Sequence, residues 1–363
     1  MFFTGCTSDT EDEQQAGRVL VPVEVKDYVM MFNENVALTR SWAPPTGYEA
    51  YPDVDKSIGV WLTQDASTPV IKKGYLFKSS GKWRAADLEL ETAGSYYLYG
   101  YIPHTPTIKA SIAPGAGGTY ASGATLTLQD VPAVTANDLC VTIGAKEGPN
   151  ADTDNGLRLG DFQYQAQAIT SADGGTGNFV FLLFDHLYAA LRIRMKVHGN
   201  YNDLRTIKLK KLELQTQIND TPSKDKTDVE IVLAATDGST NPIHSVTFTP
   251  SSGAKDITEG MEFWSSTAGE TLKTVYSEYI SYFMPLGINT LILTSTYDVY
   301  DKQGNLVRQN CKATNTMKLS DLFSEQETTR RGARYTVDMT IHPTYLYMLS
   351  EPDLDNPTVI IGN

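Results

Sequence analysis

Residues 191–197 read Leu-Arg-Ile-Arg-Met-Lys-Val, an alternation of apolar and basic side chains. Successive side chains of a β-strand point to opposite faces, so the apolar set shares one face and the basic set the other. Residues 335–341, Tyr-Thr-Val-Asp-Met-Thr-Ile, repeat this alternation. Strands with one face in a core and one in water are typical of antiparallel sandwiches rather than of buried parallel sheets.

Other β-rich runs follow one another along most of the chain. Clusters of Gly, Pro, Ser and Asp separate them, as in a protein made of many short strands. Pro22 favours an edge or a bulge for the first run, because proline cannot donate to a strand ladder. Helical signal is scarce, and residues 319–328 form a short candidate helix. The other runs lie at residues 19–25, 58–62, 74–77, 95–102, 124–128, 178–184, 229–233 and 290–297.

The chain of 363 residues is long enough for one large or two medium domains. Loop-rich residues 147–160 and the Gly/Ser/Thr-rich residues 171–177 mark a natural midpoint. We therefore expect an all-β protein of two antiparallel β-sandwich domains in tandem. The predicted boundaries are a tether over residues 1–18, a first sandwich over 19–170 and a second over 171–363.

Charge and motifs exclude several function classes. The 43 acidic and 30 basic residues give a net charge of -13, which repels nucleic acid and anionic lipid surfaces. No apolar run approaches the roughly 18 residues of a membrane helix. The sequence has no G-x-S-x-G, H-E-x-x-H, P-loop or G-x-G-x-x-G motif. We expect neither an enzymatic activity nor a cofactor.

The cysteines and histidines indicate no metal site. Cys140 and Cys311 lie far apart and outside any C-x-x-C or Cys/His motif, so we expect buried thiols, with one long-range disulfide as the alternative. The five histidines stand at no metal-ligand spacing, and we expect each at the surface or the edge of a core. Residues 150–161 imitate a calcium loop only in part, because Asn155 replaces its turn glycine. An ordinary acidic loop is the better interpretation there.

Cys6 has a different context. Residues 3–6, Phe-Thr-Gly-Cys, resemble the lipobox, where signal peptidase cuts before a cysteine that then carries lipid. Phe3 replaces the usual leucine, and the charged region of a signal peptide does not precede it. The polar residues 7–15 suit a solvated tether. We expect Cys6 to be lipidated, with an incidental cysteine in a tail as the alternative.

The aromatic residues raise an alternative function, a cell-surface lipoprotein that binds carbohydrate. Exposed aromatic platforms bind sugars, whereas aromatic ladders in strands more often serve cross-strand packing. Alternation places Tyr97, Tyr99 and Tyr101 on one face of a strand and Tyr96 on the other, which favours packing. The tryptophans that bear on this alternative are Trp42, Trp61, Trp83 and Trp264.

Seven segments follow one another along nearly the whole chain: VALTRSW (36–42), DKSIGVW (55–61), YLYGYIP (97–103), DLCV (138–141), LFDHLYAALRI (183–193), GARYTV (332–337) and PTYLYMLS (343–350). Taken in this order, they resemble segments of the fimbrillins, the type V pilin subunits of Bacteroidetes. Each segment alone is a weak signal, and their shared order is more specific. The resemblance implies two transthyretin-like β-sandwiches in tandem.

The resemblance also implies a function: a structural fimbrial subunit that supports adhesion at the outer membrane and cell surface. Pilins of the family are exported as lipoproteins and cut by an arginine-specific protease after the first strand. A strand of a neighbouring subunit then fills the exposed groove. The implied partners are other pilin subunits, of its own kind or of the tip or anchor, the protease, and the outer membrane through the lipid. A stalk, tip or anchor role stays open.

Two arginines and the end of the chain match this scheme. Arg40 corresponds to the cleavage element of the family, and Arg18 in the tether is a second candidate. Two surface arginines are the alternative interpretation. The β-branched residues Val359, Ile360 and Ile361 near the end of the chain predict a donor strand, because such a run is sticky when exposed.

Overall fold

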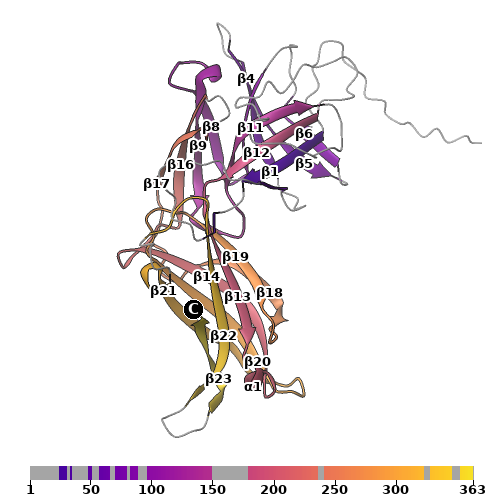
Figure 1. Cartoon of the computed structure of the whole chain (residues 1–363), viewed down its shortest axis with the longest axis vertical. Helices are drawn as coiled ribbons and strands as arrows, with labels where there is room; N and C mark the ends of the chain where they lie inside the picture. The colour runs from indigo at the N-terminus through magenta and orange to yellow at the C-terminus, as the bar shows by residue number, and fades with distance from the viewer. Residues whose placement is uncertain are drawn as a thin grey trace, which may run out of the picture.

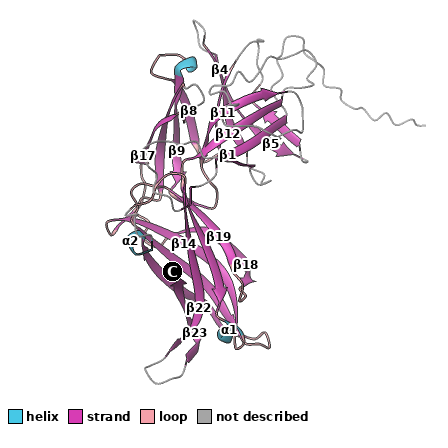
Figure 2. Ribbon diagram, in the orientation of Figure 1, coloured by secondary structure: helices cyan, strands magenta, loops and turns pink. Residues whose placement is uncertain are grey.

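The computed structural model contains four β-sheets in two halves that lie end to end (Figure 1). Strands dominate both halves, and the few helices are single short turns (Figure 2). The all-β prediction is confirmed, whereas the transthyretin-like comparison stays a prediction. The structure describes residues 24–30, 33–34, 48–50, 57–65, 70–79, 82–88, 96–148, 179–235, 241–322, 328–345 and 352–362.

The largest sheet has eight strands and forms one layer of the upper half in Figure 1. Apolar side chains cover both of its faces. Trp61 and Leu183 belong to a cluster on one face, and Val60 and Leu182 to a second cluster on the other. In spatial order its strands are β3 (Tyr48–Ala50), β1 (Glu24–Met30), β12 (Phe179–His186), β11 (Cys140–Gly148), β7 (Tyr97–Ile102), β4 (Ile58–Gln64), β5 (Val70–Ser79) and β6 (Lys82–Ala86).

A four-stranded sheet completes the upper half. Leu126 on this sheet and Tyr99 on the eight-stranded sheet are buried in the same cluster, so the two sheets share a core. Residues 120–122 form a short 3-10 turn beside it, whose backbone N–H groups at Tyr120 and Ala121 donate to the Asp65 carboxylate. The strands are β17 (Ile243–Pro250), β16 (Lys226–Ala234), β9 (Gly123–Pro132) and β8 (Lys109–Pro114).

The lower half consists of two further sheets. Leu191 and Tyr335 on one sheet and Leu212 and Leu293 on the other are buried in the cluster that also fills the upper core. The first sheet contains β10 (Val134–Thr135), β19 (Ser277–Phe283), β13 (Ala189–Val197), β22 (Ala333–Tyr345), β2 (Asn33–Glu34) and β23 (Pro352–Gly362), and the second contains β15 (Thr221–Pro222), β14 (Thr206–Ile218), β20 (Thr290–Tyr300), β21 (Leu306–Lys318) and β18 (Met261–Thr271). The helices are α1 (Gly199–Asn202) and α2 (Leu319–Leu322).

The alternation that predicts the fold is confirmed in β13 and β22. Leu191 and Met195 of β13 are fully buried, and the intervening Arg192 and Arg194 are only partly so. The two strands lie side by side in parallel, with Leu191 opposite Tyr335. The β1–β12 and β2–β22 pairs are also parallel, so the sheets are mostly but not purely antiparallel.

The tyrosines of β7 also follow the predicted alternation. Tyr99 and Tyr101 are 1% exposed in the larger cluster, and Tyr97 packs partly against it. Tyr96 is buried in the cluster on the opposite face. These tyrosines therefore serve packing, as the sequence predicts.

Sheet membership crosses the predicted boundary between residues 170 and 171. Strand β12 follows that boundary in sequence but pairs inside the eight-stranded sheet with β1 and β11. Strands β16 and β17 also follow it, and β16 pairs with β9 of the upper half, where Val229 lies opposite Leu128. The division into two folding units at this boundary stays a prediction.

We predict that β12 is central to stability. Replacing Leu183, which is 1% exposed, with alanine should lower the free energy of unfolding by about 2–5 kcal/mol, because a cavity replaces buried methyl groups. Replacing Leu204, which is 47% exposed, should cost about 0.5 kcal/mol. Urea unfolding of both variants checks this. Equal losses would contradict the assignment of Leu183 to the core.

Candidate functional site

Strand β1 lies inside the eight-stranded sheet rather than at its edge. It pairs in parallel with β12 over residues 24–29. Its other edge pairs antiparallel with β3, where Tyr28 lies opposite Ala50. Without β1, backbone N–H and C=O groups of both neighbours would lose their partners. The place of β1 is thus a slot one strand wide, between β3 and β12.

The strand that lines this slot, β12, is apolar on both faces. Phe181 and Leu183 are buried in the larger cluster, and Val180, Leu182 and Phe184 in the smaller one. All five are at most 5% exposed. A bare edge strand with this composition is a template for any other strand of matching length. The slot therefore has to be occupied.

Strands β2 and β23 share one edge of β22. Strand β13 occupies the opposite edge, from Arg334 to Ile341. Because Arg334 pairs with both β13 and β2, β2 must lie on the edge away from β13. The same reasoning places β23, since it pairs with β22 from Asp338 onward. The two strands thus meet nearly end to end, β2 at Arg334 and β23 at Asp338.

The N-terminal strands link the two halves of the molecule. Strand β1 belongs to the upper sheet, and β2, which begins at Asn33 only three positions after Met30, belongs to the lower one. Loss of both strands would expose the edge of β12 in the upper half. In the lower half it would expose β22 at Ala333 and Arg334, where β2 pairs. Of these two openings, the one on β22 lies next to the end of β23.

The predicted processing sites Cys6, Arg18 and Arg40 lie outside the described residues. Their order along the chain still has a consequence. Arg40 falls between β2, which ends at Glu34, and β3, which begins at Tyr48, so a cut there separates β1 and β2 from everything that follows. A cut after Arg18 leaves both strands attached.

The predicted donor residues lie in β23 and pair with β22 of the same chain. Val359 is opposite Ile341, Ile360 opposite Thr340, and Ile361 opposite Met339. The strand is eleven residues long and runs antiparallel to β22. The structure thus brings the end of β23 close to β2, on the same edge of β22.

A buried polar cluster at the start of β11 and the end of β12 was not predicted. The Cys140 thiol donates to Oδ2 of Asp138 over 3.3 Å, and the same oxygen is hydrogen-bonded to Nδ1 of His186. His186 is 2% exposed, so the expectation that it lies at the surface or a core edge is wrong. Asp138 and Cys140 are two residues apart in an extended segment, a local signal that both face the same way. Only the pairing of Cys140 with His186 across β11 and β12 reveals the third member.

The thiols themselves agree with expectation. Cys140 and Cys311 are both buried, and neither is in a disulfide in the structure as described.

Asp185 of β12 binds side chains of two other segments, Asn241 just before β17 and Arg331 just before β22. Its Oδ2 accepts hydrogen bonds from Asn241 Nδ2 at 2.8 Å and from Arg331 at 2.9 Å. Burial alone would raise the pKa of Asp185, but the charges of Arg331 and His186 and these hydrogen bonds lower it overall. The carboxylate therefore stabilises the fold above its unfolded pKa of about 3.9, and this contribution is lost as pH falls through the lower folded pKa.

We expect Asp185→Asn to lower the free energy of unfolding at pH 7 by about 3 kcal/mol, because it leaves the Arg331 charge without its carboxylate partner. The variant should also lose less stability than the wild type when pH falls below about 4. Urea unfolding between pH 2 and pH 7 measures both effects, with the exposed Asp203→Asn as the control. Parallel pH profiles for the wild type and Asp185→Asn would contradict this role.

The described tryptophans form no exposed platform for sugars. Trp61 is 2% exposed in the core, while Trp83 and Trp264 pack partly buried against the two clusters. Trp42 lies outside the described residues. The carbohydrate-binding alternative thus gains no support from the described tryptophans.

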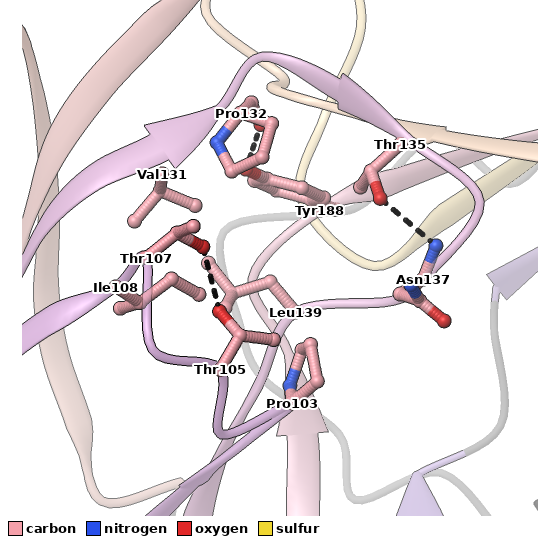
Figure 3. A pocket seen from close by; sticks show the side chains of 10 residues that line it. All are labelled: Pro103, Thr105, Thr107, Ile108, Val131, Pro132, Thr135, Asn137, Leu139 and Tyr188. Carbon is pink, nitrogen blue, oxygen red and sulfur yellow. Dashed lines mark hydrogen bonds between the residues drawn. The ribbon is translucent and has the colours of Figure 1, made fainter. Parts of the chain in front are cut away.

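A small pocket is lined in part by the end of β9 and by β10, which belong to sheets of the upper and the lower half, and Figure 3 shows its lining side chains. Its volume is about 120 Å³, and its walls are mostly apolar. The threonine hydroxyls at positions 105 and 107 bond to each other at 2.9 Å, and Tyr188 donates to the carbonyl of Pro132. Most of its polar groups are thus already paired within the wall. The pocket is lined by Pro103, Thr105, Thr107, Ile108, Val131, Pro132, Thr135, Asn137, Leu139 and Tyr188.

The two α-helices of the described chain have four residues each, far short of the roughly 20 that a helix needs to cross a bilayer.

Comparison with known proteins gives likeness in structure only. No protein-family profile and no curated protein sequence matches the chain. A candidate cell adhesion protein of Bacteroides fragilis is 12% identical at a TM-score of 0.44, covering 94% of this chain and 97% of that one. A fimbrial protein of Bacteroides vulgatus is 13% identical at 0.33, covering 84% and 91%. The fimbrial anchor protein Mfa2 of Porphyromonas gingivalis is 11% identical at 0.26, covering 93% and 96%.

The names of these three proteins, cell adhesion and fimbrial proteins, agree with the fimbrial resemblance found in the sequence. At such identities and TM-scores, however, they assign neither a function nor a residue role to this chain.

Proposed function

We propose that this chain is a structural subunit of a fimbria, exported as a lipoprotein and joined to its neighbours by strand exchange. The observation that carries the proposal is the slot of β1, which lies between β3 and a strand, β12, that is apolar on both faces. The order of fimbrillin-like segments in the sequence supports the same reading. No catalytic step is part of this function.

Processing begins at the N-terminus. Lipid on Cys6 holds the precursor at the outer membrane during export, and an arginine-specific protease cuts after Arg40. The released segment contains β1 and β2, so the cut opens the slot beside β12 and the adjoining edge of β22. Arg18 is the less effective site, because a cut there leaves both strands in place.

The donor is β23 of the neighbouring subunit. An extended strand rises about 3.3 Å per residue, so its eleven residues reach about 36 Å, whereas the six positions along β12 need only about 20 Å. The incoming strand restores the backbone hydrogen bonds of β12 and β3 and covers apolar edges. Neighbouring subunits of the same kind, or tip and anchor subunits, are the partners of this exchange at the cell surface.

Limited digestion of the purified full chain with an arginine-specific protease tests this function. We expect mass spectrometry to find one main cut, after Arg40, followed by a ladder of oligomers that resists mild SDS. Cuts scattered over many arginines with a persistent monomer would contradict a polymerising subunit. A single cut after Arg18 would contradict the role of Arg40.

A further inference from the structure

We infer that Asp138, Cys140 and His186 bind a zinc ion. A thiolate, an imidazole and a carboxylate together are a donor set typical of Zn²⁺ sites. The harder ions Mg²⁺ and Ca²⁺ prefer oxygen ligands instead. One ligand atom from each residue lies within 4.8 Å of the other two, and all three residues are buried. Among the described residues this is the one such group that includes a cysteine. The inference is independent of strand exchange.

The spacing of the ligand atoms suits a tetrahedral ion. Zinc bonds of 2.0–2.3 Å at tetrahedral angles put neighbouring ligand atoms about 3.3–3.6 Å apart. The Cys140 sulfur lies 3.3 Å from Oδ2 of Asp138 and 3.6 Å from Nδ1 of His186. The carboxylate and the imidazole are in direct hydrogen-bond contact and have to move apart to admit the ion. The thiol releases its proton when it binds, and the imidazole binds in its neutral form with Nδ1 unprotonated.

The fold holds these ligands in place before any ion binds. Cys140 and His186 are opposite each other in the antiparallel β11–β12 pair, so their side chains project on the same face. Asp138 precedes Cys140 by two residues. A hydrogen bond of 2.7 Å from the backbone N–H of Leu187 to the carbonyl of Leu139 continues the pairing by one residue, beyond the start of β11 and the end of β12. Three ligands thus come from one antiparallel strand pair and the residues just before it.

The second oxygen of Asp138 supplies an independent indication. Asp138 is 2% exposed, yet its Oδ1 atom has no hydrogen-bond partner among the residues described. A buried carboxylate oxygen left in this way costs free energy. Asp138 would bind the ion through one oxygen, and a water molecule in the fourth tetrahedral position would be a hydrogen-bond partner for the other oxygen. The ion would then fasten β11 to β12 where the chain passes from the upper half into β13.

The test uses the full chain, unfolded with chelator and refolded with ZnCl2 or CoCl2, because the buried site admits an ion most readily during folding. We expect one equivalent of zinc to be retained after gel filtration and a thiolate-to-cobalt charge-transfer band in the near ultraviolet. Cys140→Ser should lose the band and lower zinc affinity by about 100-fold or more. His186→Gln should weaken zinc binding while the folded chain is monitored by circular dichroism.

Cys311→Ser is the matched control, because Cys311 is also a buried thiol but belongs to no such ligand group in the described chain. It should retain both the zinc equivalent and the band, and so should Cys6→Ser. Refolded wild type that retains less than about a tenth of an equivalent would overturn the inference. Unchanged binding by Cys140→Ser would overturn it as well, because the ion would then lie elsewhere.

Discussion

Replacing Arg40 with alanine abolishes oligomer formation if the N-terminal segment has to leave before a neighbour can bind. Strands β1 and β2 stay covalently attached in this variant, at an effective concentration that an incoming strand of another molecule cannot match. We expect the SDS-resistant ladder to fall by at least 100-fold after protease treatment. Denaturing gels and mass spectrometry of the treated protein measure both the cut and the ladder.

The control for this experiment is Arg18→Ala. Arg18 precedes β1 in the chain, so its loss should leave the cut after Arg40 and the ladder unchanged. Arg40→Lys should also resist an arginine-specific protease, although it keeps the positive charge. If Arg40→Ala still forms the ladder and remains uncut, the slot of β1 is not the acceptor and the proposed mechanism fails.

The sequence predicts strands well wherever one face is buried and the pairing is regular. In β14 it does not, because the buried residues step from Leu209 to Leu212 instead of alternating. The pairing of β14 with β20 shifts register there, at a bulge that places one extra residue in the strand. Strand β21 is not predicted for another reason. Most of its residues are exposed, so its sequence has no alternation of apolar and polar side chains.

Pairing partners cannot be predicted from alternation. The patterns of β13 and β22 are visible in the sequence, but their parallel register depends on segments more than a hundred residues apart. The same limit applies to the cluster at His186, which lies 46 residues from Cys140 and contacts it only because β11 pairs with β12. The end-to-end placement of β2 and β23 likewise follows from β22 and from no local pattern.

Locking β23 onto β22 with a disulfide should stop polymer growth in a reversible way. His342 and Thr358 lie opposite each other in these strands, and cross-strand Cα atoms about 4.5–5.5 Å apart fit the range that a disulfide requires. We therefore expect the double variant His342→Cys, Thr358→Cys to remain monomeric after protease treatment when oxidised. Reduction should restore the ladder to the wild-type amount, because the predicted donor residues are unchanged.

Thr358→Cys alone is the matched control and should form the ladder under both conditions. A ladder from the oxidised double variant, with the disulfide confirmed by mass spectrometry, would show that β23 is not the donor.

A chain lacking residues 352–363 separates donation from acceptance. It keeps the slot of β1 and loses the donor, so it should form no ladder by itself. When about one molecule in ten of a mixture with the full chain is truncated, the ladders should become shorter. A truncated molecule can accept a donor strand but has none to give to the following subunit, so growth stops there.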